Sequence, residues 1–203
     1  QQRGKGINNT TGTSSTAAKF SSAFALGASI YSSIDNGYSK LLEEKSLSAY
    51  NYANIKPGVT QTVSVRAPYI YAEENWVDDM ELASTYMNRL NEAYQYAGQE
   101  PLTPWLGSDT AKHYQWYPFI NLGHYELAKR ISDLRRDTLL GYYRRGIQKV
   151  YEKGSQNAFY RGIPFIWCSN NLTTSFAIQC GWYRKLSNDA QFEALEQANI
   201  DWL

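Results

Sequence analysis

Apolar residues recur at intervals of three and four along most of this chain, and that spacing is typical of one face of an α-helix. Only residues 59–74 show some alternation, which is compatible with a short strand pair, although Pro68 and the acidic residues after it favour an irregular loop. We therefore expect an all-α fold of helices of about 15 to 20 residues. The predicted helices cover residues 14–34, 38–54, 77–97, 119–134, 137–153 and 170–186, and a last one follows residue 189 to the end.

The first predicted helix illustrates the pattern. Ser14 and Ser15 are suitable N-terminal caps. The residues expected on its buried stripe are Ala17, Phe20, Phe24, Ala28 and Tyr31.

The connections between the predicted helices alternate between short turns and long loops. Asp35-Asn36-Gly37 is a short turn, whereas residues 98–118 and 154–165 form long, aromatic-rich connections. Long loops inside a compact domain are usually functional. This alternation fits an α/α toroid, in which helical hairpins stack and their long loops lie together at one end. An ordinary helical bundle with long loops is the alternative. The length suits one sizeable core, so we expect residues 1–203 to form a single domain.

The overall charge excludes some partners. Twenty Lys and Arg residues against 19 Asp and Glu give a formal charge of +1, so nucleic acid is not an expected partner. No apolar run approaches the length of a membrane span, and the first residues lack the apolar centre of a secretory signal. The aromatic content of 17 Tyr, 6 Trp and 7 Phe suits burial against sugar rings as well as helix packing.

A dense group of acidic residues precedes the third predicted helix. Such carboxylates repel one another unless a cation, a basic partner or solvent compensates them. Because Trp76 and two tyrosines are interleaved with them, they predict the rim of a polar binding site, and a solvated helix N-terminus is the alternative. The group comprises Glu73, Glu74, Asp78, Asp79 and Glu81.

Zinc, redox and nucleotide chemistry have little support in the sequence. His113 and His124 have no Cys or acidic residue at zinc spacing around them, and His124 is expected to be a structural histidine inside a helix. Cys168 and Cys180 are placed on one helix, about 18 Å apart, beyond disulfide reach. No phosphate-binding loop, dinucleotide fingerprint or nucleophile motif is present.

Five segments, in consistent order over nearly the whole chain, together resemble the catalytic module of glycoside hydrolase family 9. This is the cellulase family with an (α/α)6 barrel. The segments are STAAKFSSAFALG at 15–27, APYIYAEENWVDDMELA at 67–83, EPLTPWLGSDTAKHYQWYPFINLGHYELAK at 100–129, GIPFIWCSNNLTTSFAIQCGWY at 162–183 and ANIDWL at 198–203. The resemblance implies a partial (α/α)6 barrel, an extracytoplasmic location, and inverting hydrolysis of β-1,4-linked glucans, with a β-glucan polysaccharide or oligosaccharide as partner. No nucleotide or redox cofactor is implied.

Inversion needs a general acid and a water-activating carboxylate about 6.5 to 9.5 Å apart. In the family the base comes from a D-A-G-D motif N-terminal to this stretch, and the acid is a glutamate beyond a G-x-N-P segment that follows the W-L ending. Neither motif occurs in this chain. The resemblance therefore implies a central fragment without catalytic residues, inactive in isolation. A non-catalytic glycan-binding or scaffold protein, and another six-hairpin glycosidase or lyase, are the alternatives.

The resemblance also implies substrate-binding residues. Trp167 occupies the position of a stacking tryptophan at the mouth of an inner helix, followed by Asn170 and Asn171, whose amides can bind hydroxyls. A second part of the cleft is expected at His113, Tyr114 and Trp116. Core packing is the alternative for each of these residues.

Two further expectations follow from the resemblance. A structural calcium ion is expected near Asp78 and Asp79, with simple helix-start acids as the alternative, although residues 117–123 lack the further acidic ligand that the family pattern would place there. An incomplete barrel would expose apolar helix faces and hence favour self-association.

Overall fold

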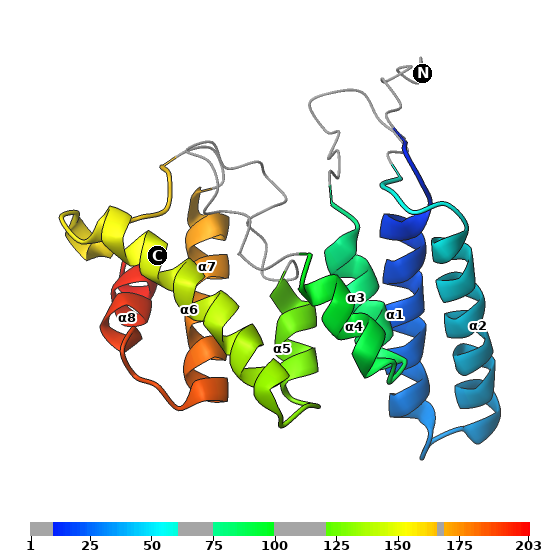
Figure 1. Cartoon of the computed structure of the whole chain (residues 1–203). Coiled ribbons are helices and arrows are strands. Elements are labelled where there is room, and N and C mark those ends of the chain that lie inside the picture. Colours follow the sequence, from blue (N-terminus) through cyan, green and yellow to red (C-terminus); the bar gives the residue numbers. More distant parts are fainter. Residues whose placement is uncertain (1–9, 61–74, 100–120, 166–168) are drawn as a thin grey trace. The chain divides into compact units, whose positions relative to one another are not determined.

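The computed structural model describes residues 10–60, 75–99, 121–165 and 169–203 (Figure 1). Within these ranges no residue belongs to a β-strand, so the all-α prediction is confirmed. None of the described helices is both long enough and apolar enough to cross a membrane. The helices are α1 (Ser14–Tyr31), α2 (Asn36–Ile55), α3 (Val77–Tyr86), α4 (Leu90–Ala97), α5 (Leu122–Ala128), α6 (Leu134–Gly154), the 3-10 helix η3 (Ala158–Tyr160), α7 (Ser169–Ser187) and α8 (Glu193–Asp201).

Internal contacts divide the chain into two units, residues 1–99 and 100–203, and each is described by itself. The prediction of a single domain over the whole chain stays a prediction.

In unit 1, helices α1 and α2 run antiparallel as a hairpin, α1 also packs on α3, and α3 packs on α4 (Figure 1). The turn between α1 and α2 is specified by Asp35, whose Oδ1 accepts a hydrogen bond from the Tyr38 backbone N–H at 2.9 Å. Small side chains bring the two helices close together. The Ser21 hydroxyl donates to the Ser46 backbone carbonyl at 3.0 Å, and the Ser46 hydroxyl donates to the Ser21 backbone carbonyl at 2.9 Å. Hydrogen bonds between small polar residues therefore help to join the two helices of the hairpin.

This close approach overturns part of the expectation for the first helix. Phe20 and Tyr31, predicted on its buried stripe, are 57% and 38% exposed, whereas Ala17 and Ala28 are buried as predicted. Helices in close contact have no room between them for large rings. The bulky side chains therefore lie along the outer surface of the hairpin.

The predicted capping serines have another role. Thr13 is the N-cap residue of α1 and makes no side-chain capping bond. The Ser14 hydroxyl donates to the Ala53 carbonyl at 2.7 Å, and the Ser15 hydroxyl accepts from the Thr60 backbone N–H at 2.9 Å. Both serines thus fix the start of α1 to the end of α2 and the residues after it.

The single helix predicted over residues 77–97 is two helices. Asn88 has a left-handed φ of 59°, which asparagine adopts more readily than most residues. The chain reverses there, and the Arg89 backbone N–H donates to the Ser84 carbonyl at 2.8 Å, as at other helix C-termini. Apolar residues at helical spacing, Met87 and Leu90, continue through the break and conceal it in the sequence.

In unit 2, helices α6 and α7 pack on each other, α5 contacts both of them, and α8 packs on α7. The predicted boundary between the fourth and fifth helices is wrong, because α5 ends at Ala128 and α6 begins at Leu134. Asp133 is the N-cap residue of α6, accepting from the Arg135 backbone N–H at 2.9 Å. The core is formed by Tyr125, Tyr143, Ile147, Val150, Ile163, Leu172, Phe176, Cys180, Tyr183, Phe192 and Leu195.

Candidate functional site

The first turn of α7 presents the two predicted amide side chains to solvent. Asn170 and Asn171 are both exposed, while Leu172 and Phe176 on the opposite face are buried in the core of unit 2. This alternation follows from helical periodicity, which turns the apolar residues inward and leaves the asparagines outside. The amides are therefore held on a helix that the core fixes in place. Whether a saccharide uses them stays a prediction.

The other predicted substrate-binding residues, Trp167, His113, Tyr114 and Trp116, lie outside the described residues. Their assignment also stays a prediction. Asn170 and Asn171 are the part of the predicted cleft for which the surroundings are described.

The predicted metal ligands lie in the first turn of α3. Asp78 and Asp79 are 8% and 7% exposed, so they are buried rather than part of an open rim. The ammonium nitrogen of Lys19 on α1 lies 2.7 Å from Oδ2 of Asp79. A basic partner therefore compensates one carboxylate, which is one of the ways in which such an acidic group can be accommodated.

These residues fit a calcium ion only in part. Calcium favours six to eight oxygen ligands. Among the described residues no three His, Cys, Asp or Glu side chains come together as a metal-binding group. Lys19 also competes for the Asp79 carboxylate, so calcium at this position stays a prediction.

His124 is a buried residue of α5. It is 1% exposed, and its ring lies 5.5 Å from the Tyr142 ring centroid and 6.2 Å from that of Tyr143. This packing agrees with the expectation of a structural histidine.

A buried polar chain, which the sequence reasoning missed, crosses the core of unit 2. Asn121 Nδ2 donates to Gln179 Oε1 at 2.5 Å, and the Tyr143 hydroxyl donates to the Asn121 carbonyl. Gln179 is fully buried, and its Nε2 has no hydrogen-bond partner among the described residues. The available signal was Gln179 itself, a polar residue one turn after Phe176 on the apolar stripe of α7.

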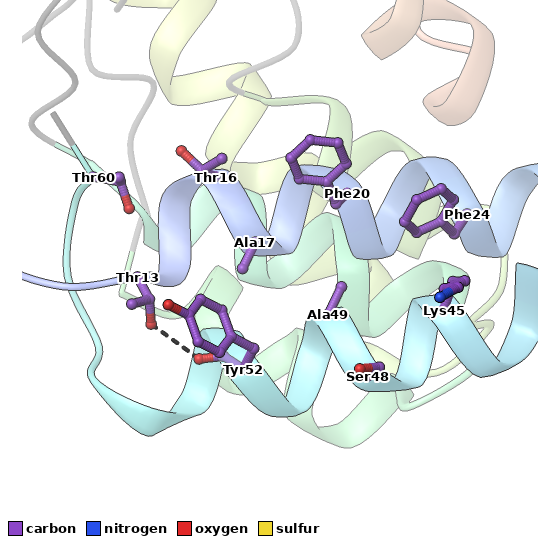
Figure 2. A pocket seen from close by; sticks show the side chains of 10 residues that line it. All are labelled: Thr13, Thr16, Ala17, Phe20, Phe24, Lys45, Ser48, Ala49, Tyr52 and Thr60. Carbon is purple, nitrogen blue, oxygen red and sulfur yellow. Dashed lines mark hydrogen bonds between the residues drawn. The ribbon is translucent and has the colours of Figure 1, made fainter. Parts of the chain in front are cut away.

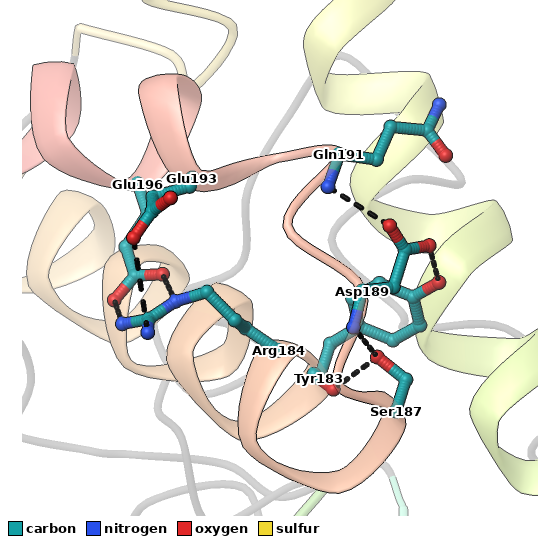
Figure 3. Close-up of polar contacts among 7 residues, drawn as sticks. All are labelled: Tyr183, Arg184, Ser187, Asp189, Gln191, Glu193 and Glu196. Atoms are coloured by element: carbon teal, nitrogen blue, oxygen red, sulfur yellow. Dashed lines mark hydrogen bonds and ion pairs between the residues drawn. The ribbon is translucent and has the colours of Figure 1, made fainter.

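Charged side chains brace the junction of α7 and α8 (Figure 3). Arg184 donates from Nε and Nη2 to the two carboxylate oxygens of Glu196, both at 3.0 Å, in the bidentate geometry that arginine favours. Glu193 adds a longer ion pair at 3.9 Å. The pKa of Arg184 rises above its usual value because it donates hydrogen bonds to Glu196.

The turn before α8 contains a second hydrogen bond to a carboxylate. The Tyr183 hydroxyl donates to Asp189 Oδ2 at 2.7 Å (Figure 3). Burial, together with this hydrogen bond, raises the pKa of Tyr183 to about 12. The same bond is the main cause that lowers the pKa of Asp189.

Cys180 has no feature of a reactive thiol. It is buried in the core of unit 2, and that burial raises the pKa of its thiol well above the usual value. A neutral, inaccessible thiol is a poor nucleophile. Cys180 therefore acts as a packing residue.

Solved structures share the fold of this chain. One is AaCel9A in complex with cellobiose-like isofagomine, with a TM-score of 0.60 and 18% identity over 90% of this chain and 36% of that chain. Another is the family 9 endoglucanase J30, with a TM-score of 0.66 and 16% identity over 95% of this chain and 37% of that chain. A third is the single mutant (D468A) of a thermostable endoglucanase from Alicyclobacillus acidocaldarius, with a TM-score of 0.52 and 18% identity over 90% and 36%.

The chain thus spans little more than a third of the length of these structures. The prediction of part of an (α/α)6 barrel is confirmed. No curated protein matches the chain. The family model for glycosyl hydrolase family 9 matches residues 1–203, and the chain therefore belongs to glycosyl hydrolase family 9.

Proposed function

We propose that this chain is part of an enzyme that cleaves β-1,4-glucosidic bonds in glucans, such as cellulose, mixed-linkage glucan or xyloglucan, with inversion. The observation that carries the proposal is the family 9 match over residues 1–203. The similar solved structures add support, because two of them are endoglucanases and another is in complex with cellobiose-like isofagomine.

In this proposal the chain contributes to substrate binding. Amide groups can both donate to and accept from sugar hydroxyls, and Asn170 and Asn171 present theirs to solvent. Trp167 supplies the stacking surface, with His113, Tyr114 and Trp116 in the same cleft.

No residue of this chain is proposed as the general acid or base. A water-activating carboxylate must reach both a water molecule and the sugar. Asp79 is buried and already bound by Lys19, which makes it a poor base. The catalytic pair of the enzyme would therefore lie outside residues 1–203, and the chain alone would be inactive.

We place the enzyme outside the cytoplasm, because its polymeric substrates are not cytoplasmic molecules. A calcium ion near Asp78 and Asp79 belongs to the proposal as a structural element and takes no part in the reaction.

A groove between α1 and α2 supports self-association (Figure 2). Its volume is about 460 Å³, and its lining includes the aromatic residues Phe20, Phe24 and Tyr52. Among the described residues that line it, Lys45 is the only Lys, Arg, Asp or Glu. A second copy of the chain could thus cover the groove with a single lining charge, that of Lys45, to compensate, which is why we propose a second copy as its occupant.

The central experiment measures both turnover and binding. Reducing-sugar release from soluble β-1,4-glucans is expected to be absent, whereas cellotetraose should bind in isothermal titration calorimetry. Asn170→Ala combined with Asn171→Ala should weaken this binding at least tenfold, and Asn51→Ala, an exposed asparagine of α2, is the matched control.

Turnover by the purified chain would contradict the proposed location of the catalytic pair. Unchanged binding in the double variant would remove Asn170 and Asn171 from the site. Binding without turnover also fits a glycan-binding scaffold protein, and the longer reading frame around this sequence distinguishes the two functions.

A further inference from the structure

A pocket of about 310 Å³ in unit 2 contains an arginine beside two aromatic rings. The guanidinium carbon of Arg161 lies 5.7 Å from the ring centroid of Phe165 and 5.9 Å from that of Trp202. Phe165 is 69% exposed, so a broad apolar surface is open to solvent next to the charge. Asn157 and Ala158 complete the lining.

The guanidinium makes no hydrogen bond or ion pair with any residue that the structure describes. Arg184 and Arg135, in the same unit, both bind carboxylates at 3.0 Å or less. None of the described residues that line the pocket is acidic. The N–H donors of Arg161 are thus available, and its charge is not balanced within the pocket.

The backbone beside the pocket is held in an unusual conformation. Phe159 and Tyr160 have φ values of 57° and 49°, a left-handed region in which bulky residues are true outliers. Residues in such strained conformations are found at ligand clamps and active sites. Here the conformation places the Phe159 ring 5.5 Å from the Trp202 ring, in an edge-to-face contact.

Close packing fixes this turn. A Cβ atom on Gly162 would lie 2.1 Å from the Val150 carbonyl oxygen, and one on Gly154 would lie 2.2 Å from that of Tyr160. Only glycine allows so close an approach to the end of α6. Asn157 Nδ2 also donates to the Arg161 carbonyl at 2.8 Å. The loop that carries Arg161 is therefore held in place by its packing, and the pocket is preorganised for a ligand.

We propose that this pocket binds a carboxylate-bearing sugar residue, a uronic acid. The carboxylate would accept two parallel hydrogen bonds from Arg161, the geometry for which a guanidinium is best suited. The C–H face of the pyranose would pack on the exposed Phe165 ring. A neutral sugar would leave the arginine charge unbalanced. The choice of a saccharide rests on the proposed function, and it extends that function to glucans with acidic side groups or to neighbouring acidic polysaccharides.

The test compares three probes by isothermal titration calorimetry: methyl β-glucuronide, methyl β-glucoside and acetate. The glucuronide should bind at least tenfold more tightly than either of the others. Arg161→Gln should lose at least a factor of ten, and Arg161→Lys should fall between because a lysine lacks the planar pair of donors. Arg145→Gln is the matched control, since Arg145 also lies over an aromatic ring, that of Tyr142, at 5.1 Å.

Equal binding of glucoside and glucuronide would overturn the role of the charge. Equal binding of acetate would overturn the role of the sugar ring. Unchanged affinity in Arg161→Gln, with an unaltered circular dichroism spectrum, would overturn the site. Cellotetraose binding, measured on the same proteins, reports the proposed function separately, so either inference can fail without the other.

Discussion

Lys19 and Asp79 join α1 to α3 through a 2.7 Å contact between Nζ and Oδ2. The lysine side chain is 43% exposed and that of the aspartate 9%, so only the carboxylate depends strongly on the contact. Lys19→Met should lower the free energy of unfolding by about 1–2 kcal/mol, less than a fully buried pair would lose, because solvent partly replaces the lysine. Urea denaturation measures this loss. Adding Asp79→Asn should recover part of it, and a further loss in the double variant would contradict the pairing.

Calcium and Lys19 compete for the same carboxylate. If the predicted ion binds, millimolar calcium should raise the melting temperature of Lys19→Met more than that of the parent chain. Asp78→Asn combined with Asp79→Asn should abolish the rise. Thermal unfolding followed by circular dichroism, with EDTA as the reference, checks the prediction. No rise in any of these proteins would remove calcium from this position.

The Tyr183 and Asp189 pair predicts a defined pH dependence. Tyr183 has a raised pKa, about 12 against 10.0, so its contribution is complete below about pH 10 and is lost as the pH rises toward 12. Asp189 has a lowered pKa, so its contribution is present above its usual value of 3.8 and is lost as the pH falls below it. The stability difference from Tyr183→Phe should therefore be constant between roughly pH 5 and 9 and shrink at both extremes. Urea unfolding across this range measures it, and a difference that still rises above pH 10 would refute the assignment.

The buried amide pair of unit 2 should behave as a coupled unit. Asn121→Leu leaves the Gln179 side chain without its partner in the core, and the expected cost is about 1–3 kcal/mol. Gln179→Met added to this variant removes the stranded amide and should restore part of the stability. A double-mutant cycle by chemical denaturation measures the coupling. Simple additivity would show that the two amides do not depend on each other.

Self-association through the groove between α1 and α2 can be tested at Phe20. Phe20→Lys should shift the chain toward monomer in sedimentation velocity, because a charge on the groove would be buried in the contact. Ile55→Lys, another exposed apolar residue of the same hairpin, is a control that does not line the groove. Equal effects of both changes would indicate non-specific hydrophobic contact.

Helical periodicity was enough to predict the fold class and most helices, because burial of one face dominates their formation. It failed at Asn88, where a left-handed backbone interrupts an apolar pattern that continues on both sides. It also misplaced Phe20 and Tyr31, because the pattern does not reveal that small residues would draw α1 and α2 together. Local sequence signals do not carry such tertiary effects.

The two candidate binding sites also differ in how far the sequence alone predicts them. Asn170 and Asn171 could be proposed as binding residues from their positions in a motif, and the periodicity of α7 explains their exposure. The pocket at Arg161 could not be found, since it depends on left-handed conformations at Phe159 and Tyr160 that no propensity of aromatic residues would suggest. It also depends on Trp202, which is distant in sequence and is brought near by the packing of α8 on η3.

The helices of each unit pack mainly on helices one or two elements away along the chain, α1 on α2 and α3, α3 on α4, and α7 on α8. Contacts between residues close in sequence form quickly, because little chain entropy is lost in closing the loop between them. The α1 and α2 hairpin can consequently assemble on the ribosome as soon as residue 60 has emerged. Nascent α3 and α4 would then find a formed surface to fold against, so that unit 1 can fold while the residues of unit 2 are still being translated.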